Sequence, residues 1–387
     1  MILTLNMKNI LFVSHDANRA GSQILLLRFL RLLKENQNFK FSVLLKDGGI
    51  IENEFNEIAQ TYYWKKQNLG GKKSLLGKLY KKIIHKDIFI NEVLDTLKNQ
   101  NFDLIVSNTI TNGDILPILN QLNCPIITYV HELEMGIQQY TKPEFFQNVL
   151  ALSSSYIACA ESVKQNLIQN HHINSTQIKV LPSLLPESAL IYKLDKLLNE
   201  KLRNQYDIPL DAFLIGGMGT VDLRKGVDIF LQVASKFKHN QSIFFLWVGG
   251  QDTETDYKNF QIDKSRLELK NVIFQKSVEN PLDFMSIFDV FFVSSREDPY
   301  PLVVLEAAIL SKPIICFDKA GGAKDFVEND CGAIIEYLNV DKVVEKIGEL
   351  KENLSLIEQI GVTARKKVLE RHNQEKAFQT FVEILNK

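Results

Sequence analysis

The sequence contains no apolar run that approaches the roughly 20 residues of a membrane-spanning helix. Its opening segment, residues 1–6, is too short for a secretory signal peptide. We therefore expect a cytoplasmic protein. Cysteine is sparse, and the widely separated positions favour neither a zinc site nor a disulfide framework. Reduced, buried thiols are expected at Cys124, Cys159, Cys316 and Cys331.

A charge bias is also lacking. The chain has 45 Lys and Arg against 46 Asp and Glu, a formal net charge of -1. This balance argues against a generally basic nucleic-acid binder, so we expect no nucleic-acid partner. A neutral total still permits a local basic patch.

Several catalytic motifs are absent. No G-x-x-x-x-G-K-[S/T] loop occurs, which excludes a P-loop kinase or ATPase. Gly217-x-Gly219 is only half of a dinucleotide fingerprint because Asp222 occupies the third position, which argues against a dehydrogenase. There is no Asp-x-Asp pair either, so we expect no metal requirement.

What the sequence does contain is an alternation of short β-rich runs with longer helical patterns, which predicts parallel sheets covered by helices on both faces. The expected strands of a first series are 9–14, 39–45, 104–107, 125–130, 156–160 and 178–181. Those of a second series are 213–218, 243–248, 272–274, 290–293, 313–317 and 332–335. The fold class is therefore α/β, with two tandem Rossmann-like, doubly wound domains.

The length of 387 residues also exceeds the size at which one core usually stops growing. We place the first domain at residues 1–185 and the second at 186–369, with residues 182–209 as the connection. Open α/β sheets bind ligands beyond the carboxyl ends of their strands. An active site between the two domains is expected.

One segment, residues 294–308, is the most informative. Glu306 interrupts an apolar run, where a carboxylate is costly unless a partner meets it. Pro301 fits the first position of a helix, and Asp298 lies on a stiff loop before it. The free amides of such a helix start, near Leu302 and Val303, favour an anion.

The spacing of Asp298 and Glu306, with seven residues between them, resembles the motif of retaining glycosyltransferases of family 4, which have the GT-B fold. In that family the first acid touches the donor sugar and the second holds the ribose hydroxyls of the nucleotide. Asp298 stands where the family usually has Glu. Glu306 as a helix-start carboxylate paired with a nearby Lys or Arg is the alternative.

A basic loop follows the expected strand 213–218. Arg224 and Lys225 lie where a diphosphate could be neutralised, although most such pairs are solvated loop cations. Lys225 and Gly226 resemble the family's Lys-Gly motif, which supplies the phosphate-binding lysine. The family often has another Arg about six residues earlier; here Arg224 is the candidate to supply that charge.

Two further glycine sites are predicted on the donor side. Gly249 lies at a strand end, where a glycine allows a ligand close to the backbone and where a plain turn is equally compatible. Gly322 belongs to a pair that resembles the family's glycines before the helix that reaches the donor sugar.

Further candidates come from the first domain: Gly21 is expected on the donor side, and Ser22 and Glu132 on the acceptor side. Gly21 and Ser22 start an apolar helix and resemble the family's glycine-rich first loop, with Ser22 as a simple N-cap the alternative. His131 and Glu132 end an expected strand at the ligand-binding edge. His131 matches the family's histidine near the reacting sugar carbon. The resemblance also implies that the last helix, 370–387, completes the first domain.

Between Glu57 and Asp87 there is no acidic residue, whereas lysines crowd the span from Lys65 to Lys86 beside an apolar stripe. This composition is typical of a helix on an anionic membrane surface, and equally of a packed helix with solvated lysines.

The resemblance implies transfer of a sugar from a nucleotide-diphosphate sugar to a glycan or lipid-linked acceptor, in surface polysaccharide or glycolipid synthesis. UDP is favoured as the nucleotide, GDP is possible, and no cofactor is required. The alternatives are a non-catalytic sugar- or nucleotide-binding protein, a sugar-nucleotide epimerase, and glycogen- or sucrose-type synthesis. Asp298 in place of Glu and the missing upstream Arg favour the binding protein.

Overall fold

The computed structural model describes residues 7–36, 39–65, 90–185 and 187–386. The chain forms two compact units, one made of Met1–Leu184 with Glu375–Lys387 and the other of Leu185–Gln374. Among the described residues, no helix combines the length and the apolarity needed to cross a membrane. The lysine-rich span falls almost entirely outside the described residues; of it, Lys65 is described and pairs with Asp47.

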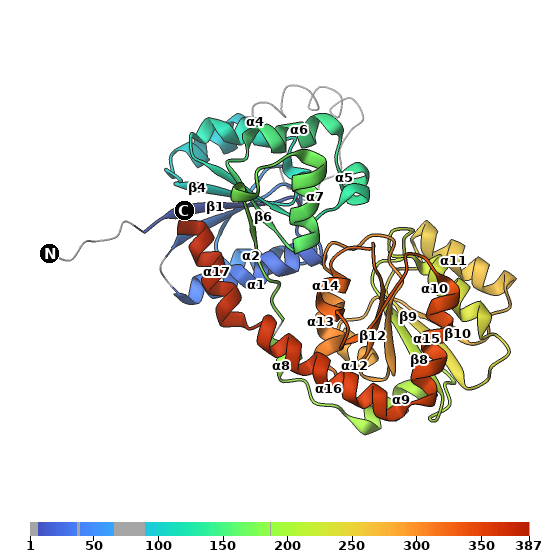
Figure 1. The fold of residues 1–387 in the computed structure, drawn as a ribbon. Helices are drawn as coiled ribbons and strands as arrows, with labels where there is room; N and C mark the ends of the chain where they lie inside the picture. Colours follow the sequence, from blue (N-terminus) through green and yellow to red (C-terminus); the bar gives the residue numbers. More distant parts are fainter. Residues whose placement is uncertain (1–6, 37–38, 66–89, 186, 387) are drawn as a thin grey trace. The chain divides into compact units, whose positions relative to one another are not determined.

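The described part of the first unit contains a seven-stranded parallel sheet in the order β3-β2-β1-β4-β5-β6-β7 (Figure 1). Its strands are β1 (Asn9–Ser14), β2 (Lys40–Leu45), β3 (Gln60–Tyr63), β4 (Leu104–Asn108), β5 (Ile126–Val130), β6 (Ser155–Ala158) and β7 (Ile178–Val180). Strand β3 was not predicted. It is an edge strand of mixed polarity with no buried residue, so it lacks the apolar run that marks the inner strands.

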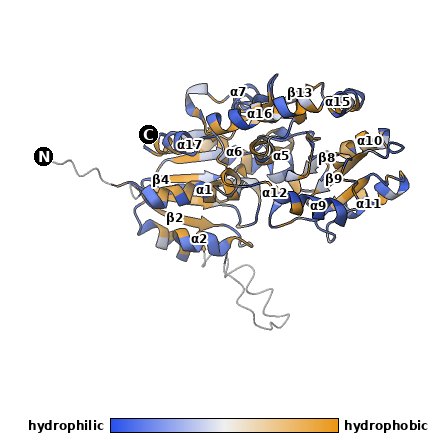
Figure 2. Cartoon of the chain, turned by 90° about the horizontal axis from the view of Figure 1, so that it is seen from below, coloured by the Kyte–Doolittle hydropathy of each residue, from blue (hydrophilic) through white to orange (hydrophobic). Residues whose placement is uncertain are grey.

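Helices cover both faces of this sheet. Their bounds are α1 (Gly21–Asn36), α2 (Glu52–Ile58), α4 (Leu116–Leu119), α5 (Glu134–Tyr140), α6 (Pro143–Leu152), α7 (Glu161–His171) and α17 (Gln374–Asn386). The hydropathy colouring places the apolar residues on the strands and on the helix faces toward them (Figure 2). Burial of these apolar faces is what holds the layers together.

The last helix belongs to the first unit although it is far from it in sequence. The ring of Phe381 lies 4.6 Å from that of Phe29 in α1 and 6.1 Å from that of Phe12 in β1. The ammonium of Lys8 donates to the carbonyl oxygen of Leu385 at 3.0 Å. Aromatic packing therefore anchors α17 beside α1 and β1.

The second unit contains a six-stranded parallel sheet in the order β10-β9-β8-β11-β12-β13. Its strands are β8 (Phe213–Met218), β9 (Ile243–Val248), β10 (Val272–Gln275), β11 (Val290–Val293), β12 (Ile314–Phe317) and β13 (Gly332–Ile335). These strands were predicted to within one residue at their ends. They carry nearly continuous apolar runs because both faces of the sheet are covered.

The helices of the second unit include two within the expected connection. Their bounds are α8 (Glu187–Leu190), α9 (Lys196–Gln205), α10 (Val227–Lys236), α11 (Thr255–Arg266), α12 (Pro281–Ser286), α13 (Leu302–Ile309), α14 (Ala323–Val327), α15 (Val340–Glu352) and α16 (Leu354–Arg371).

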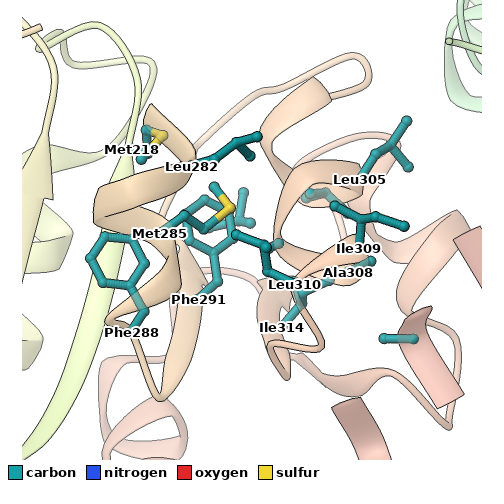
Figure 3. Packing of buried hydrophobic residues seen from close by; sticks show 14 of the residues in the cluster. Met218, Leu282, Met285, Phe288, Phe291, Leu305, Ala308, Ile309, Leu310 and Ile314 are labelled. Atoms are coloured by element: carbon teal, nitrogen blue, oxygen red, sulfur yellow. The ribbon is translucent and has the colours of Figure 1, made fainter. Parts of the chain in front are cut away.

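Helix α13 lies in the core of the second unit. Leu305, Ala308 and Ile309 pack in one cluster with Met285 of α12 and Phe291 of β11 (Figure 3). Burial of a Leu or Ile side chain of this kind contributes about 1.5–3 kcal/mol. The helix that carries Glu306 is therefore fixed in position by its buried face.

Candidate functional site

The order of the second sheet reverses between β8 and β11. From β8 the chain moves outward to β9 and β10, and it returns to β11 on the other side. The carboxyl ends of two strands at such a switch point leave room for a ligand. The loop after β8, residues 219–226, and the loop after β11, residues 294–301, meet there; we call them the cation loop and the motif loop.

An ion pair joins these two loops. The Lys225 ammonium lies 2.5 Å from Asp298 Oδ2, and the side chains are only 14% and 8% exposed. The Ser295 hydroxyl donates to the same oxygen at 3.4 Å. The structure thus brings together the lysine and the first acid that the sequence singled out.

Arginine side chains add further links. Arg224 donates from Nη1 to the carbonyl oxygen of Glu297 at 2.9 Å, and the amide of Arg296 donates back to the Arg224 carbonyl at 2.8 Å. The guanidinium of Arg296 donates two hydrogen bonds of 2.7 Å each to the carboxylate of Asp228 at the start of α10. This bidentate geometry is the strong form of an Arg–carboxylate contact. Hydrogen bonding to Asp228 raises the pKa of Arg296.

Gly226 permits the close approach of the two loops. Its φ is +68°, and a Cβ at this position would lie 2.0 Å from the carbonyl oxygen of Ser294. Any other residue would have to push the motif loop away. The glycine of the Lys-Gly pair is thus required by packing.

The motif loop also pairs with the loop before α14. The amide of Asp298 donates to the Ala320 carbonyl at 2.6 Å, and the amide of Gly322 donates to the carbonyl oxygens of Asp298 and Pro299 at 3.1 and 3.0 Å. The predicted donor-side glycine therefore uses its N–H group to hold the motif loop.

Pro301 was expected at the first position of a helix, and the structure places it one residue before the helix. It is the N-cap of α13, with φ -70° and ψ 115°, and the helix begins at Leu302 rather than at the proline. An extended ψ at Pro301 ends the stiff loop and turns the chain into the helix. The first turn still leaves amide groups near Leu302 and Val303 without partners inside the helix. Glu306 is half-buried one turn further on.

Close backbone packing explains why position 249 is a glycine. Its φ is +137°, and an added Cβ would lie 1.9 Å from the carbonyl oxygen of Gly219. The glycine lets the ends of β8 and β9 approach each other. This contact accounts for the residue type without a ligand, as the plain-turn alternative supposed.

The first sheet has a switch point of the same kind between β1 and β4. The imidazole Nε2 of His131, after β5, lies 2.9 Å from Asn108 Oδ1 at the end of β4. His15, directly after β1, contacts Gln23 Nε2 at 3.1 Å and the Thr109 hydroxyl at 3.4 Å. The described residues thus place two histidines at this edge.

The hydrogen bonds of Asn108 set the tautomer of His131. Asn108 Nδ2 donates to the carbonyl oxygen of Ser22 at 3.2 Å, which leaves Oδ1 to accept. Nε2 of His131 must then carry the proton, and Nδ1 is the basic nitrogen. Burial, with a smaller contribution from His15, lowers the pKa of His131 to about 3. The ring is therefore neutral at physiological pH.

The remaining candidates of the first unit, Gly21 on the donor side and Ser22 and Glu132 on the acceptor side, lie at the same edge. Gly21 is exposed and starts α1, and Ser22 is in the first turn, with its hydroxyl donating to Gln23 Oε1 at 2.8 Å. Ser22 is thus inside the helix rather than its N-cap. The carboxylate of Glu132 is buried and accepts the backbone N–H of His131 at 2.8 Å.

Sequence reasoning missed His15, Asn108 and Thr109. Thr109 has φ +79°, a strained value for a β-branched residue, and it follows β4 directly. The signal that was available is their position immediately after expected strands at the central edge of the sheet. None of them belongs to a motif, so the spacing in sequence gave no reason to group them.

No cluster of three or more His, Cys, Asp or Glu side chains suited to a metal ion occurs among the described residues. Cys124 is half-buried, and Cys159, Cys316 and Cys331 are buried. Burial raises the pKa of Cys316 to about 12, so this thiol stays protonated.

A sequence profile of a known family matches part of the second unit. Residues 199–367 match the profile of the family described as "Glycosyl transferases group 1". This segment makes up less than half of the chain. It contains the cation loop, the motif loop and helix α13. Family 4 within this group stays a prediction.

The chain is also similar to curated glycosyltransferases. The chain is 28% identical over 225 residues to the capsular polysaccharide biosynthesis glycosyltransferase CapM of Staphylococcus aureus, covering 56% of this chain and 57% of CapM. It is 26% identical over 239 residues to the O-antigen biosynthesis glycosyltransferase WclY of Escherichia coli, covering 56% of this chain and 61% of WclY. The aligned stretches thus span less than two thirds of these relatives.

Solved structures extend the likeness over almost the whole chain. HepE of Anabaena, crystallised with UDP and glucose, has a TM-score of 0.81 at 19% identity, with 98% of this chain and 99% of HepE covered. TarM of S. aureus has a TM-score of 0.73 at 14% identity, covering 98% of this chain and 100% of that one. At these identities the likeness shows the fold alone. The predicted GT-B class, with two Rossmann-like domains, is confirmed.

Proposed function

We propose that this protein is a retaining glycosyltransferase that moves a sugar from a UDP-sugar to a hydroxyl of a glycan or lipid-linked acceptor. The observation that carries the proposal is the Lys225–Asp298 pair at the switch point between β8 and β11, inside the segment that matches the group 1 profile. HepE was crystallised with UDP-glucose, which supports UDP as the nucleotide. CapM and WclY act in capsule and O-antigen synthesis, which supports a role in surface polysaccharide formation.

Transfer requires stabilisation of the leaving diphosphate. The bond between the anomeric carbon and the phosphate oxygen breaks, and one between that carbon and the acceptor hydroxyl oxygen forms. Lys225, Arg224 and the amides near Leu302 and Val303 stabilise the charge on the departing phosphate, which takes up the hydroxyl proton. No protein nucleophile is needed.

The other residues have binding roles in this proposal. Glu306 accepts hydrogen bonds from the ribose hydroxyls, and Asp298 touches the donor sugar. The ammonium of Lys225 then attracts two anions, the Asp298 carboxylate and the diphosphate. His131, being neutral, orients sugar hydroxyls by hydrogen bonding.

Ligand-induced stabilisation tests the donor. UDP is expected to raise the melting temperature more than GDP or ADP, since a ligand at 100 times its Kd stabilises the native state by about 2.7 kcal/mol. A matched probe is 2′-deoxy-UDP. Wild-type protein should prefer UDP, and Glu306→Gln should bind both nucleotides equally. An unchanged preference in this variant removes Glu306 from the ribose site.

Product analysis tests the reaction. Incubation with UDP-sugars and a lipid-linked or glycan acceptor should yield a glycoside whose anomeric configuration, measured by NMR, equals that of the donor. Alteration of the nucleotide sugar without an acceptor would instead indicate an epimerase. Saturable UDP-sugar binding with no turnover on any acceptor would leave a non-catalytic binding protein.

A further inference from the structure

Tyr300 and His372 form a contact that joins the motif loop to the end of α16. The Tyr300 hydroxyl lies 2.8 Å from His372 Nε2. The two rings are 5.7 Å apart, centroid to centroid, with an interplanar angle of 34°. Seventy-two positions separate the two residues along the chain.

His372 is held from several directions. Its backbone N–H donates to the carbonyl oxygen of Val368 at 2.9 Å, so it caps α16. Its ring lies 5.9 Å from that of Phe326 in α14, and the residue is 8% exposed. The imidazole is therefore a fixed point, because packing and backbone bonding both restrain it.

Tyr300 lies in the motif loop, close to Asp298 and to the start of α13. It stands between Pro299 and Pro301, two residues after Asp298 and directly before the N-cap of α13. Backbone hydrogen bonds hold the loop at Asp298 and Pro299, on the side toward β12. The Tyr300 hydroxyl supplies a side-chain attachment at the other end, next to the amides that begin α13.

We propose that His372 is a positioning residue for nucleotide-sugar transfer, acting through Tyr300 on the motif loop. This inference rests on the function proposed above. The imidazole holds Tyr300, Tyr300 fixes the turn between the two prolines, and that turn sets where Asp298 and the first amides of α13 meet the donor. The chain passes from the second unit to the first only two residues after His372.

Conservative variants separate this role from simple packing. Tyr300→Phe removes only the hydroxyl, and His372→Phe keeps an aromatic ring against Phe326 but removes the nitrogen. Each is expected to raise the KM for the UDP-sugar about fivefold, as expected for one hydrogen bond, with kcat and the acceptor KM within about twofold of wild type. His372→Gln, which can bond again to Tyr300, should recover most of the loss.

The double variant gives the decisive measurement. If the two side chains act through one bond, Tyr300→Phe with His372→Phe should raise the donor KM no more than either single change. The matched control is Tyr192→Phe, which removes the bond from a tyrosine hydroxyl to Asp283 Oδ1, 2.8 Å long, in the same unit. It should leave donor KM unchanged.

UDP affinity can be followed without turnover. The indole N–H of Trp247 donates to the Gly219 carbonyl at 3.3 Å, at the start of the cation loop. In a Trp64→Phe background, Trp247 fluorescence should report UDP binding, weakened about fivefold in Tyr300→Phe.

The outcomes distinguish the two proposals. Wild-type protein that neither binds UDP nor transfers sugar contradicts the proposed function itself. A wild type that does both, with variants whose donor KM and UDP affinity equal the wild-type values, overturns the positioning role even if their melting temperatures fall. Additive losses in the double variant would also overturn it.

Discussion

The switch points of the two sheets occupy equivalent places and contain different chemistry. Between β8 and β11, opposite charges meet: Lys225 faces Asp298, and Arg296 grips Asp228. Between β1 and β4, amides, hydroxyls and two imidazoles with lowered pKa meet instead, and one carboxylate, that of Asp16, lies 3.5 Å from His15. One edge is thus suited to a charged diphosphate, and the other to uncharged hydroxyl groups.

The difference also concerns what each edge needs for stability. A buried ion pair is costly to break, because the remaining charge is left without its partner. The other edge is sensitive to protonation, since burial disfavours a positive charge on the imidazole of His131. The first edge should therefore respond most strongly to loss of charge, and the second to gain of charge.

The largest effect is expected from Lys225→Met. Removal of the ammonium should lower the transfer rate about 10³-fold, as when one donor to a developing oxyanion is lost. It also leaves the Asp298 carboxylate buried without its ion-pair partner. Kinetics should be compared with Lys225→Met combined with Asp298→Asn, which restores the charge balance. Recovery of the melting temperature without recovery of activity would separate the two effects; full activity in either variant contradicts the phosphate role.

Gly226→Ala should separate the two loops. The new methyl group collides with the Ser294 carbonyl, and a φ of +68° is unfavourable for alanine. The free energy of unfolding should therefore fall by about 3 kcal/mol. Gly348→Ala is the matched control, since nothing lies within 4 Å of its Cβ inside α15. For Gly348→Ala the free energy of unfolding should rise by about 0.5–1 kcal/mol. Denaturant titrations measure both, and equal effects would argue against the close approach.

Asn108→Asp should alter the neutral edge. A carboxylate next to His131 Nε2 favours the imidazolium, so the pKa of His131 should rise from about 3. NMR titration of the ring measures this directly, and transfer near pH 7 should fall about tenfold if neutral His131 is required. Asn148→Asp, at an amide that donates to the Gly113 carbonyl, is the control. An unmoved His131 pKa would contradict the assigned tautomer.

The smallest effect is a pH dependence of stability. Burial lowers the folded-state pKa of His131 to about 3 and also lowers that of His15. Between the unfolded value of about 6.5 and the folded values, the unfolded chain binds more protons, so stability falls as pH falls. From pH 7 to pH 5 the loss from His131 should be about 1–2 kcal/mol.

The two tryptophans can assign that loss to one unit. Trp64 lies in the first unit and Trp247 in the second, so single-tryptophan variants report each unit separately. The Trp64 transition should shift more between pH 7 and pH 5. His239→Asn, at an exposed histidine, should not change the shift, whereas His131→Asn should reduce it. Equal shifts for both tryptophans would contradict the contrast between the edges.

Much of the fold could be predicted because the inner strands are apolar throughout. The runs 213–218 and 243–248 match β8 and β9 at both ends. Edge strand β3 could not be found this way, since it contains no apolar run and none of its residues is buried. The break at His372 between α16 and α17 has no local signal either. No proline or glycine marks it, and it is fixed by contacts with Tyr300 and Phe326.

The sequence by itself determined the α/β class, the two sheets and the acid-to-acid spacing of Asp298 and Glu306, since these follow from local apolar periodicity and from one short motif. Only the tertiary structure decided that Lys225 pairs with Asp298, that Asn108 sets the tautomer of His131, and that His372 reaches Tyr300. Each of these contacts joins residues from different loops or helix ends. Their distances depend on how strands and helices pack, and no local pattern encodes that.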